Sequence, residues 1–295
     1  MASLVLVLIA GLGAAWFLSP RPINPQALVM DRLRAAGGTY VSLDSVAPQM
    51  REAVVAAEDE RFWRHHGIDA IGLVRSVAYD VSHVSLRQGA STITEQLGKD
   101  LYLAGDDRSP LRKVEDAVVA VRLESHLSKD QILELYLNEV YFGSGATGVC
   151  EASERYFGVS PSHLSLGEAS LLAGMIEAPT LDDPYSNAPG ARDRQAQVLT
   201  SMVRDGYITE SEAQGAVSRP LLLAGGKILP VDGDATVLPG PQISLPIALA
   251  GLAFVIVGVA GFVVARGKHM SVWPTTSLVV FAGGLVLVAR ALRAD

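Results

Sequence analysis

Three uncharged hydrophobic runs bracket a polar middle, and they constrain the fold more than any other feature of the chain. They are residues 2–19 (ASLVLVLIAGLGAAWFLS), 243–265 (ISLPIALAGLAFVIVGVAGFVVA) and 275–289 (TTSLVVFAGGLVLVA). A helix that crosses a bilayer needs roughly 20 apolar residues. The second run is therefore long enough, and the third is long enough if it extends to Leu292 with Arg290 reaching toward the interface. The alternative for the third run is a glycine-rich buried helix.

The first run is shorter and lacks a basic segment before it and a clear cleavage site after it. These features favour a signal anchor over a cleaved signal peptide, which is the alternative. The loop between the last two runs carries Arg266 and Lys268, and positively charged loops stay in the cytoplasm. We therefore expect the polar middle of the chain on the extracytoplasmic face of the cytoplasmic (inner) membrane.

Composition narrows the function of this exported part. The net charge of −7 argues against nucleic acid as a partner, because phosphates bind to clustered positive charge. Cys150 is the single cysteine of the 295 residues, so the chain can form no intramolecular disulfide. A core of about 200 residues is large enough to be stable without one.

The middle of the chain predicts a mainly α fold, because no stretch alternates as a strand does. Ser128 with Gln131 and Ser165 with Glu168 have the spacing of capping boxes. The expected helices lie in residues 50–65, 69–81, 109–127, 128–142, 165–176, 190–206 and 209–217. The expected domain boundaries are residues 1–19 for the anchor, 20–223 for the helical domain, 224–242 for a Gly/Pro-rich linker and 243–293 for two transmembrane helices.

The stretch AAEDERFWRHHGID (56–69) holds the first candidate site. On one helix, Glu58, Phe62 and His65 would share a face. A partly buried carboxylate beside an aromatic ring has a raised pKa and suits a general base or acid. The alternative is a solvated charged face with Phe62 anchoring the core. A metal site at His65 and His66 lacks a partner at ligand spacing.

The stretch RQGASTITEQLGKD (87–100) holds the second candidate site. A small, hydroxyl-rich turn opens a helix that Ser91 or Thr92 would cap, and the free N–H groups there would form an anion site. Gln96 and Lys99 add an amide and a cation, which suit a sugar linked to a phosphate. An ordinary capped helix would explain Ser91 but not the density of polar residues.

The third candidate site is RKVEDAVVAVRLE (112–124). Helical spacing places Asp116 on the apolar face with Leu123, and Glu115 on the face of Arg112 toward water. An inward carboxylate requires a partner or a cleft.

Together these stretches resemble the family 51 peptidoglycan glycosyltransferases. EDERFWRHHG resembles the signature ED-x-x-F-x-x-H-x-G, and GASTITEQLGKD resembles G-[GA]-S-T-I-T-Q-Q-L-x-K-N. RKVED and SKDQILELYLNEVYFGSG follow in the family's order, so the resemblance covers roughly residues 45–215. It implies a lysozyme-like helical fold of two lobes divided by a cleft. It also implies a membrane-anchored enzyme that polymerises lipid II into β-1,4-linked glycan strands and releases undecaprenyl pyrophosphate.

The resemblance assigns roles residue by residue. Glu58 falls where the family has its general base, and Asp116 falls on the family's second glutamate. The positions expected to bind or shape the substrate are Asp59, Phe62, His65, Ser91, Thr92, Gln96, Lys99, Arg112, Lys113 and Glu134. The leaving pyrophosphate requires a cation, which lysine, arginine or a divalent metal (Mg or Mn) supplies. No organic cofactor is expected.

The chain also departs from the family pattern. Asp116 is one methylene shorter than glutamate, and Glu95, Asp100 and Glu115 add negative charge where the pyrophosphate is expected. One alternative is therefore a catalytically weakened cell-wall scaffold of the same fold. Another is a lysozyme-like hydrolase or lytic transglycosylase.

The signature motifs of a penicillin-binding transpeptidase domain do not appear, so we expect a monofunctional enzyme. Its C-terminal hairpin would either anchor the chain or dock a partner such as a penicillin-binding transpeptidase.

Overall fold

The computed structural model describes residues 17, 19–73, 91–103 and 110–231, with the side chains of residues 110 and 111 excepted. The chain divides into two compact units, residues 1–68 with 91–240 and residues 69–90 with 241–295. The second unit is described only at residues 69–73, where the Ile71 amide donates to Asp69 Oδ1 at 3.1 Å.

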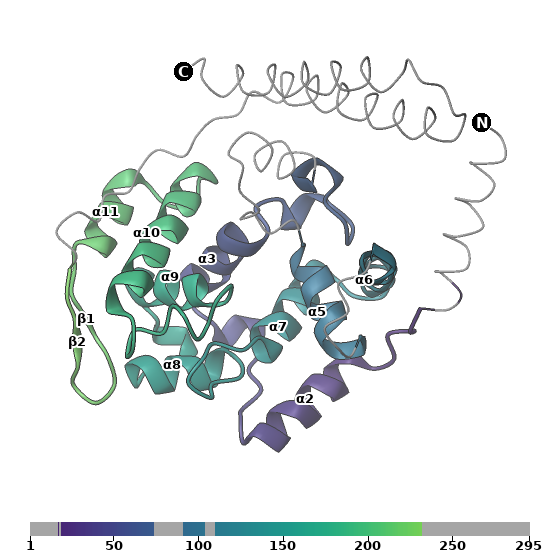
Figure 1. Ribbon diagram of the computed structural model, residues 1–295, viewed down its shortest axis with the longest axis horizontal. Helices are drawn as coiled ribbons and strands as arrows, with labels where there is room; N and C mark the ends of the chain where they lie inside the picture. Colours follow the sequence, from purple (N-terminus) through teal and green to yellow (C-terminus); the bar gives the residue numbers. More distant parts are fainter. Residues whose placement is uncertain (1–16, 18, 74–90, 104–109, 232–295) are drawn as a thin grey trace, which may run out of the picture. The chain divides into compact units, whose positions relative to one another are not determined.

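The first unit is built from helices, which confirms the mainly α prediction (Figure 1). The α-helices are α2 (Pro25–Ala36), α3 (Pro48–Glu58), α5 (Ile93–Tyr102), α6 (Pro110–Glu124), α7 (Lys129–Glu139), α8 (Val149–Phe157), α9 (Leu166–Met175), α10 (Ala188–Arg204) and α11 (Glu210–Val217). Among the described residues, the short 3₁₀ turns are η1 (Leu43–Ser45), η2 (Phe62–Arg64) and η3 (Pro161–His163). The division into two lobes by a cleft stays a prediction.

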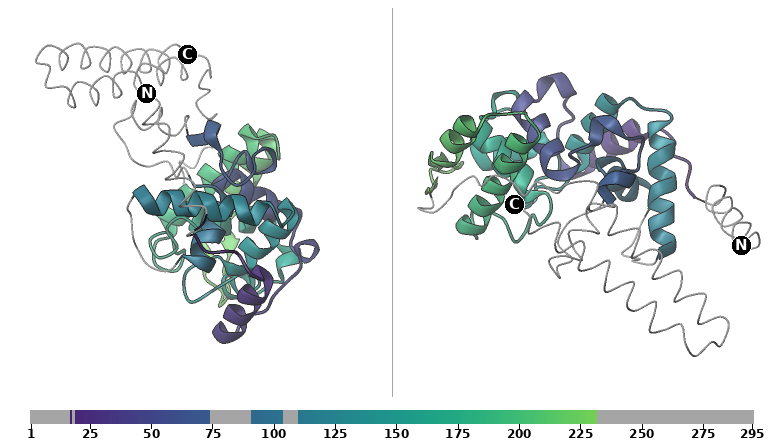
Figure 2. Two further views of the ribbon diagram at one scale, coloured as in Figure 1. Left: turned by 90° about the vertical axis from the view of Figure 1, so that its right-hand side faces the viewer. Right: turned by 90° about the horizontal axis from the view of Figure 1, so that it is seen from above.

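The core lies where helix packs on helix. α9 packs against α3 and α10, and α5 packs against α6 and α7. Nearly every residue of α9 is buried, as expected of a helix that is apolar on all sides. Figure 2 shows the same arrangement from two further sides; in the described part of the chain, the sheet structure is limited to one two-stranded ribbon.

Side-chain caps begin the helices where the sequence predicts them. Ser128 and Gln131 form a capping box at α7, and Ser165 and Glu168 form one at α9. Each box satisfies N–H groups that the first turn of a helix leaves without partners.

The helix expected over residues 50–65 is wrong in its second half. α3 ends at Glu58, because Asp59 leaves the helical conformation (φ −157°, ψ 74°). Its carboxylate there accepts hydrogen bonds from outside α3. Glu58, Phe62 and His65 therefore do not share one helical face.

The folded part also continues past residue 223, where we expected the linker to begin. β1 (Leu221–Leu222) and β2 (Ile228–Leu229) form a short antiparallel ribbon, and Leu229 is fully buried. The glycines of its turn have positive φ angles, which suit Gly. Two residues per strand are too few for an alternating pattern to reveal.

The three hydrophobic runs lie almost wholly outside the described residues, so the expected spanning helices are not tested. Within the part of the chain that the structure describes, no helix has the length and apolar character needed to cross a membrane.

Candidate active site

Glu58 is the last residue of α3 and is partly buried. Burial raises the pKa of its carboxyl to about 7, with smaller contributions from the negative charges of Glu177 and Asp59. A hydrogen bond from Gln96 and the positive charge of Arg194 act in the opposite direction. Near neutral pH this carboxyl is therefore ionised in a substantial fraction of molecules, which suits a group that accepts a proton.

Glu58 is held by a side chain from another helix. Gln96 on α5 donates from Nε2 to Glu58 Oε2 at 2.8 Å. Gln96 Oε1 in turn accepts a hydrogen bond from the Tyr136 hydroxyl of α7 at 2.9 Å. The structure thus brings together two predicted site residues and adds Tyr136, which the sequence analysis missed because it lies in the apolar stripe of its helix.

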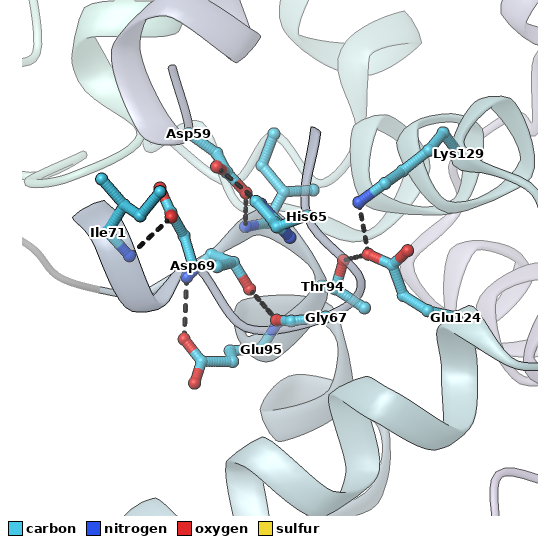
Figure 3. Close-up of polar contacts among 11 residues, drawn as sticks. Asp59, His65, Gly67, Asp69, Ile71, Thr94, Glu95, Glu124 and Lys129 are labelled. Carbon is cyan, nitrogen blue, oxygen red and sulfur yellow. Dashed lines mark hydrogen bonds and ion pairs between the residues drawn. The ribbon is translucent and has the colours of Figure 1, made fainter. Parts of the chain in front are cut away.

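Asp59 and His65 form a buried pair beside Glu58 (Figure 3). His65 Nε2 lies 2.9 and 3.0 Å from the two carboxylate oxygens of Asp59. Since an ionised carboxylate only accepts, this nitrogen donates. The Ile93 amide donates to the same carboxylate at 3.0 Å. The pair therefore connects α3, the loop after it and α5, and its expected contact with substrate stays a prediction.

Phe62, the first residue of η2 in this loop, is a fully buried core residue. Lys129 Nζ lies 4.3 Å from the centroid of its ring and 2.5 Å from Glu124 Oε1. The Glu124 carboxylate also accepts from the Thr94 hydroxyl at 2.8 Å, as Figure 3 shows. This is the core-anchor role that we held as the alternative for Phe62.

The first turn of α5 differs from the predicted anion site, because its amides have protein partners. The Thr92 amide donates to Glu95 Oε2 at 2.8 Å, the Glu95 amide donates to the Thr92 hydroxyl at 3.1 Å, and the Ile93 amide binds Asp59. The Thr92 hydroxyl donates to the Gly67 carbonyl at 2.7 Å. The expectation of free N–H groups is therefore wrong for these three amides.

Glu95 has a structural explanation. Its carboxylate completes the capping box of α5, a role that glutamine can also fill. Burial raises its pKa, and the Thr92 amide and the positive charge of Lys113 oppose that shift. Glu95 is one of the acidic residues by which this chain departs from the family pattern, and its carboxylate caps the N-terminus of α5.

Asp116 is buried on α6, as its predicted helical face requires. Arg112 Nε lies 3.4 Å from Asp116 Oδ1, and Lys113 Nζ lies 3.7 Å from Asp116 Oδ2. Lys113 also donates to the Ser91 hydroxyl at 2.9 Å, and most of its side chain is exposed. Asp116 therefore has two cations at ion-pair distance, although its Oδ1 accepts no hydrogen bond from a described residue. Through Lys113 it is also connected to Ser91.

The expected orientation of Arg112 is corrected by the same contacts. We expected Arg112 to turn toward Glu115 and water, but its guanidinium lies against Asp116 with only a tenth of the side chain exposed. Glu115 is partly buried.

The remaining predicted residues lie apart from these contacts. Lys99 is exposed in the last turn of α5, and Asp100 follows it, also exposed. Glu134 on α7 accepts from the Tyr40 hydroxyl at 2.6 Å and from the Leu43 amide at 2.8 Å. The two oxygens of Glu134 thus hold Tyr40 and the first residue of η1, and a contact with substrate stays a prediction.

The described residues contain no cluster of side chains that could bind a metal ion. Among them, no three His, Cys, Asp or Glu side chains gather closely enough to hold an ion. We therefore assign no step to a metal, and the Mg or Mn that the family resemblance suggested stays an untested prediction.

Comparisons with known proteins agree with the motifs. Residues 26–203 match the transglycosylase family. A Cupriavidus necator protein named as a transglycosylase is 42% identical over 202 residues, which are 68% of this chain and 87% of that protein. Penicillin-binding protein 1A of Aquifex aeolicus is 42% identical over 182 residues, 62% of this chain and 25% of that protein.

Penicillin-binding protein 1A of Escherichia coli is 42% identical over 174 residues, 58% of this chain. The match spans 20% of that protein, so this chain corresponds to a small part of the penicillin-binding proteins. A crystal structure of penicillin-binding protein 1A from Haemophilus influenzae aligns with a TM-score of 0.38 at 22% identity, over 63% of this chain and 18% of that one.

Proposed function

We propose that this chain, which belongs to the family 51 peptidoglycan glycosyltransferases, polymerises lipid II into β-1,4-linked glycan strands with inversion at the anomeric carbon. The proposal rests on the position and the raised pKa of the Glu58 carboxyl. This residue ends α3 beside Gln96, and its pKa is raised to about 7.

Glu58 serves as the general base in this reaction. It takes the proton from the 4-hydroxyl of the acceptor sugar, whose oxygen attacks the donor's C1. The bond between C1 and the pyrophosphate oxygen breaks as the new C1–O4 bond forms. Undecaprenyl pyrophosphate leaves with the electron pair of the broken bond.

Positive charge stabilises that leaving group. Lys113 and Lys99 are the exposed cations among the predicted substrate residues, and an ammonium group suits a pyrophosphate oxygen. Asp116 holds Lys113 and Arg112 on one side of α6, so its role is to place these cations. The shorter side chain of aspartate fits this role because both partners lie on the preceding turn of the same helix.

The lipid-linked substrate supports a location at the cytoplasmic membrane, with the helical domain on the extracytoplasmic face. The hydrophobic runs at residues 2–19, 243–265 and 275–289 would provide the anchors, and the last two could also dock a cell-wall synthesis partner. A cysteine placed near Asp232 should react with an impermeant thiol reagent in intact cells, and one placed near Ser271 should not, both in a Cys150→Ser background. The reverse pattern would put the domain in the cytoplasm and contradict the proposal.

The activity itself is tested with two substrates. We expect wild-type protein to extend lipid II into glycan strands and to leave finished strands uncut, whereas a lysozyme-like hydrolase would cut them. Glu58→Gln keeps the size of the side chain but removes the base, so the polymerisation rate should fall by about two to four orders of magnitude. A Glu58→Gln rate within a few-fold of wild type would show that Glu58 is not the base, and an inactive wild type would favour the scaffold.

A further inference from the structure

Two hydrogen bonds in series link a buried tyrosine to the proposed base. The Tyr136 hydroxyl on α7 donates to Gln96 Oε1 at 2.9 Å, and Gln96 Nε2 on α5 donates to Glu58 Oε2 at 2.8 Å. Tyr136 is almost fully buried. The three side chains come from three different helices, so the series depends on the tertiary fold.

The two ends of the series decide which way the Gln96 amide faces. An ionised carboxylate can only accept hydrogen bonds, so it requires the NH₂ group of the amide. The amide oxygen then faces Tyr136 and requires a donor there. Burial raises the pKa of the Tyr136 hydroxyl well above its ordinary value of 10, so this group keeps its proton over the whole neutral range.

The opposite orientation of the Gln96 amide would favour the protonated form of Glu58. With its oxygen toward Glu58, the amide would need a protonated carboxyl as donor, and its NH₂ group would face the Tyr136 oxygen. The Tyr136 proton would then lose its acceptor, and a buried donor without a partner is costly. The tyrosine hydroxyl thus disfavours the arrangement that stabilises the protonated carboxyl.

We propose that Tyr136 is a positioning residue of the glycosyltransferase reaction, which holds the Gln96 amide with its NH₂ group toward Glu58 and so favours the ionised base. This inference rests on the proposed role of Glu58. It goes beyond that role because Tyr136 acts only through Gln96.

The other charged groups around Glu58 have ion-pair partners of their own. Glu177, which follows α9, is paired with Arg194 of α10 at 2.5 Å, and Asp182 lies 3.8 Å from the same guanidinium. Asp59, the neighbour of Glu58, is paired with His65.

On the tyrosine side, Asp100, Glu58 and Asp59 add to the rise in the pKa of Tyr136. Replacing the Tyr136 hydroxyl leaves all of these charged groups in the protein. A change in the titration of Glu58 can therefore be traced to the amide.

The test is Tyr136→Phe in the full chain, reconstituted in detergent or nanodiscs. The carboxyl ¹³C shift of Glu58, assigned by its loss in Glu58→Gln, should titrate about one pKa unit higher than in wild type. One unit is a tenfold change in the ratio of the two forms. The lipid II polymerisation rate should then fall about tenfold at pH 6 and less than twofold at pH 9. A purely structural role would lower the rate by the same factor at every pH.

Tyr156→Phe is the matched control. It removes the hydroxyl of another fully buried tyrosine, which donates to the Phe142 carbonyl at 3.1 Å and takes no part in the series. Its Glu58 titration should equal that of wild type. An unchanged Glu58 titration in a folded Tyr136→Phe protein overturns the inference while leaving Glu58 as the base. A Glu58→Gln enzyme that keeps its activity overturns the proposed function instead.

A second variant covers the case in which Tyr136→Phe does not fold. Gln96→Leu removes the amide, so the Glu58 pKa should rise by at least as much. Adding Tyr136→Phe to a folded Gln96→Leu protein should cause no further shift, because the tyrosine has lost the group through which it acts. A Glu58 pKa that is unchanged in Gln96→Leu contradicts the proposal by itself.

Discussion

The Asp59 carboxylate, one residue past the end of α3, accepts a hydrogen bond from the amide of Ile93, the first residue of α5, at 3.0 Å. It thereby ties the helix that ends in Glu58 to the helix that carries Gln96. The ring of His65 adds a second donor at 2.9 Å. This buried carboxylate thus helps to set the position of the proposed base relative to its amide partner.

Replacing Asp59 by alanine should destabilise the protein by about 3 kcal/mol, because it removes a carboxylate that accepts two buried donors. Urea unfolding followed by circular dichroism measures the change. The control is Asp31→Ala, which removes an exposed carboxylate paired with Arg34 and should cost less than about 1 kcal/mol. Equal effects of the two changes would contradict the connecting role of Asp59.

Replacing Gly67 by alanine should be nearly as costly as losing Asp59. Gly67 has a φ of +90°, and a Cβ there would lie 2.9 Å from the Ala120 carbonyl carbon and the Val121 amide nitrogen of α6. Backbone atoms cannot move aside as a side-chain end can, so we expect a loss of about 2–4 kcal/mol.

Gly145→Ala is the matched control for Gly67→Ala. Gly145 has a φ of +78° with no atom within 4 Å of the added Cβ, so alanine adds backbone strain alone. A loss of about 1 kcal/mol is expected there. Equal losses at the two glycines would show that the approach to α6 is unimportant.

Glu58 should make the stability of the protein depend on pH. Its pKa rises from 4.5 in the unfolded chain to about 7 in the folded protein. The folded state therefore favours the protonated carboxyl, and the stability that it contributes below pH 4.5 is lost as the pH rises to 7. Glu58→Gln has no charge to bury, so its stability relative to wild type should be about 3 kcal/mol higher at pH 8 than at pH 4. Urea midpoints at the two pH values measure this, and a difference independent of pH would contradict the raised pKa.

Asp116 should matter far more to activity than its neighbour Glu115. Asp116→Asn removes the negative charge beside Arg112 and Lys113 and should remove most lipid II polymerisation, while Asp116→Glu should keep or raise it. Glu115→Gln should change the rate little. A large loss of activity in Glu115→Gln would assign the role of the second carboxylate to Glu115 instead of Asp116. If neither Asp116→Asn nor Glu115→Gln affects activity, the family's second carboxylate has no counterpart here. An inactive wild type that Asp116→Glu restores would favour the scaffold.

The sequence predicted local features well where near neighbours decide them. The capping boxes at Ser128 and Ser165 need only residues three positions apart. The inward face of Asp116 follows from the period of a single helix. The family was likewise predicted from short motifs in a fixed order, and the match of residues 26–203 to the transglycosylase family confirms it.

The predictions from sequence were wrong where a group distant in the chain competes with a local preference for helix. The stretch 50–65 has good helix formers and no Gly or Pro, yet the Ile93 amide, 34 positions away from Asp59, provides a partner that a continued helix would lose. The same contact occupies an amide that we expected to be free for an anion.

The sequence by itself therefore determined the helical class, the family and the identity of the candidate base, because residue type and spacing carry that information. Only the tertiary structure decided what surrounds the base. The end of α3 at Glu58, the amide of Gln96 and the hydroxyl of Tyr136 meet through contacts between residues 38 and 40 positions apart. Burial of the carboxyl, which raises its pKa, exists only once the helices have packed together.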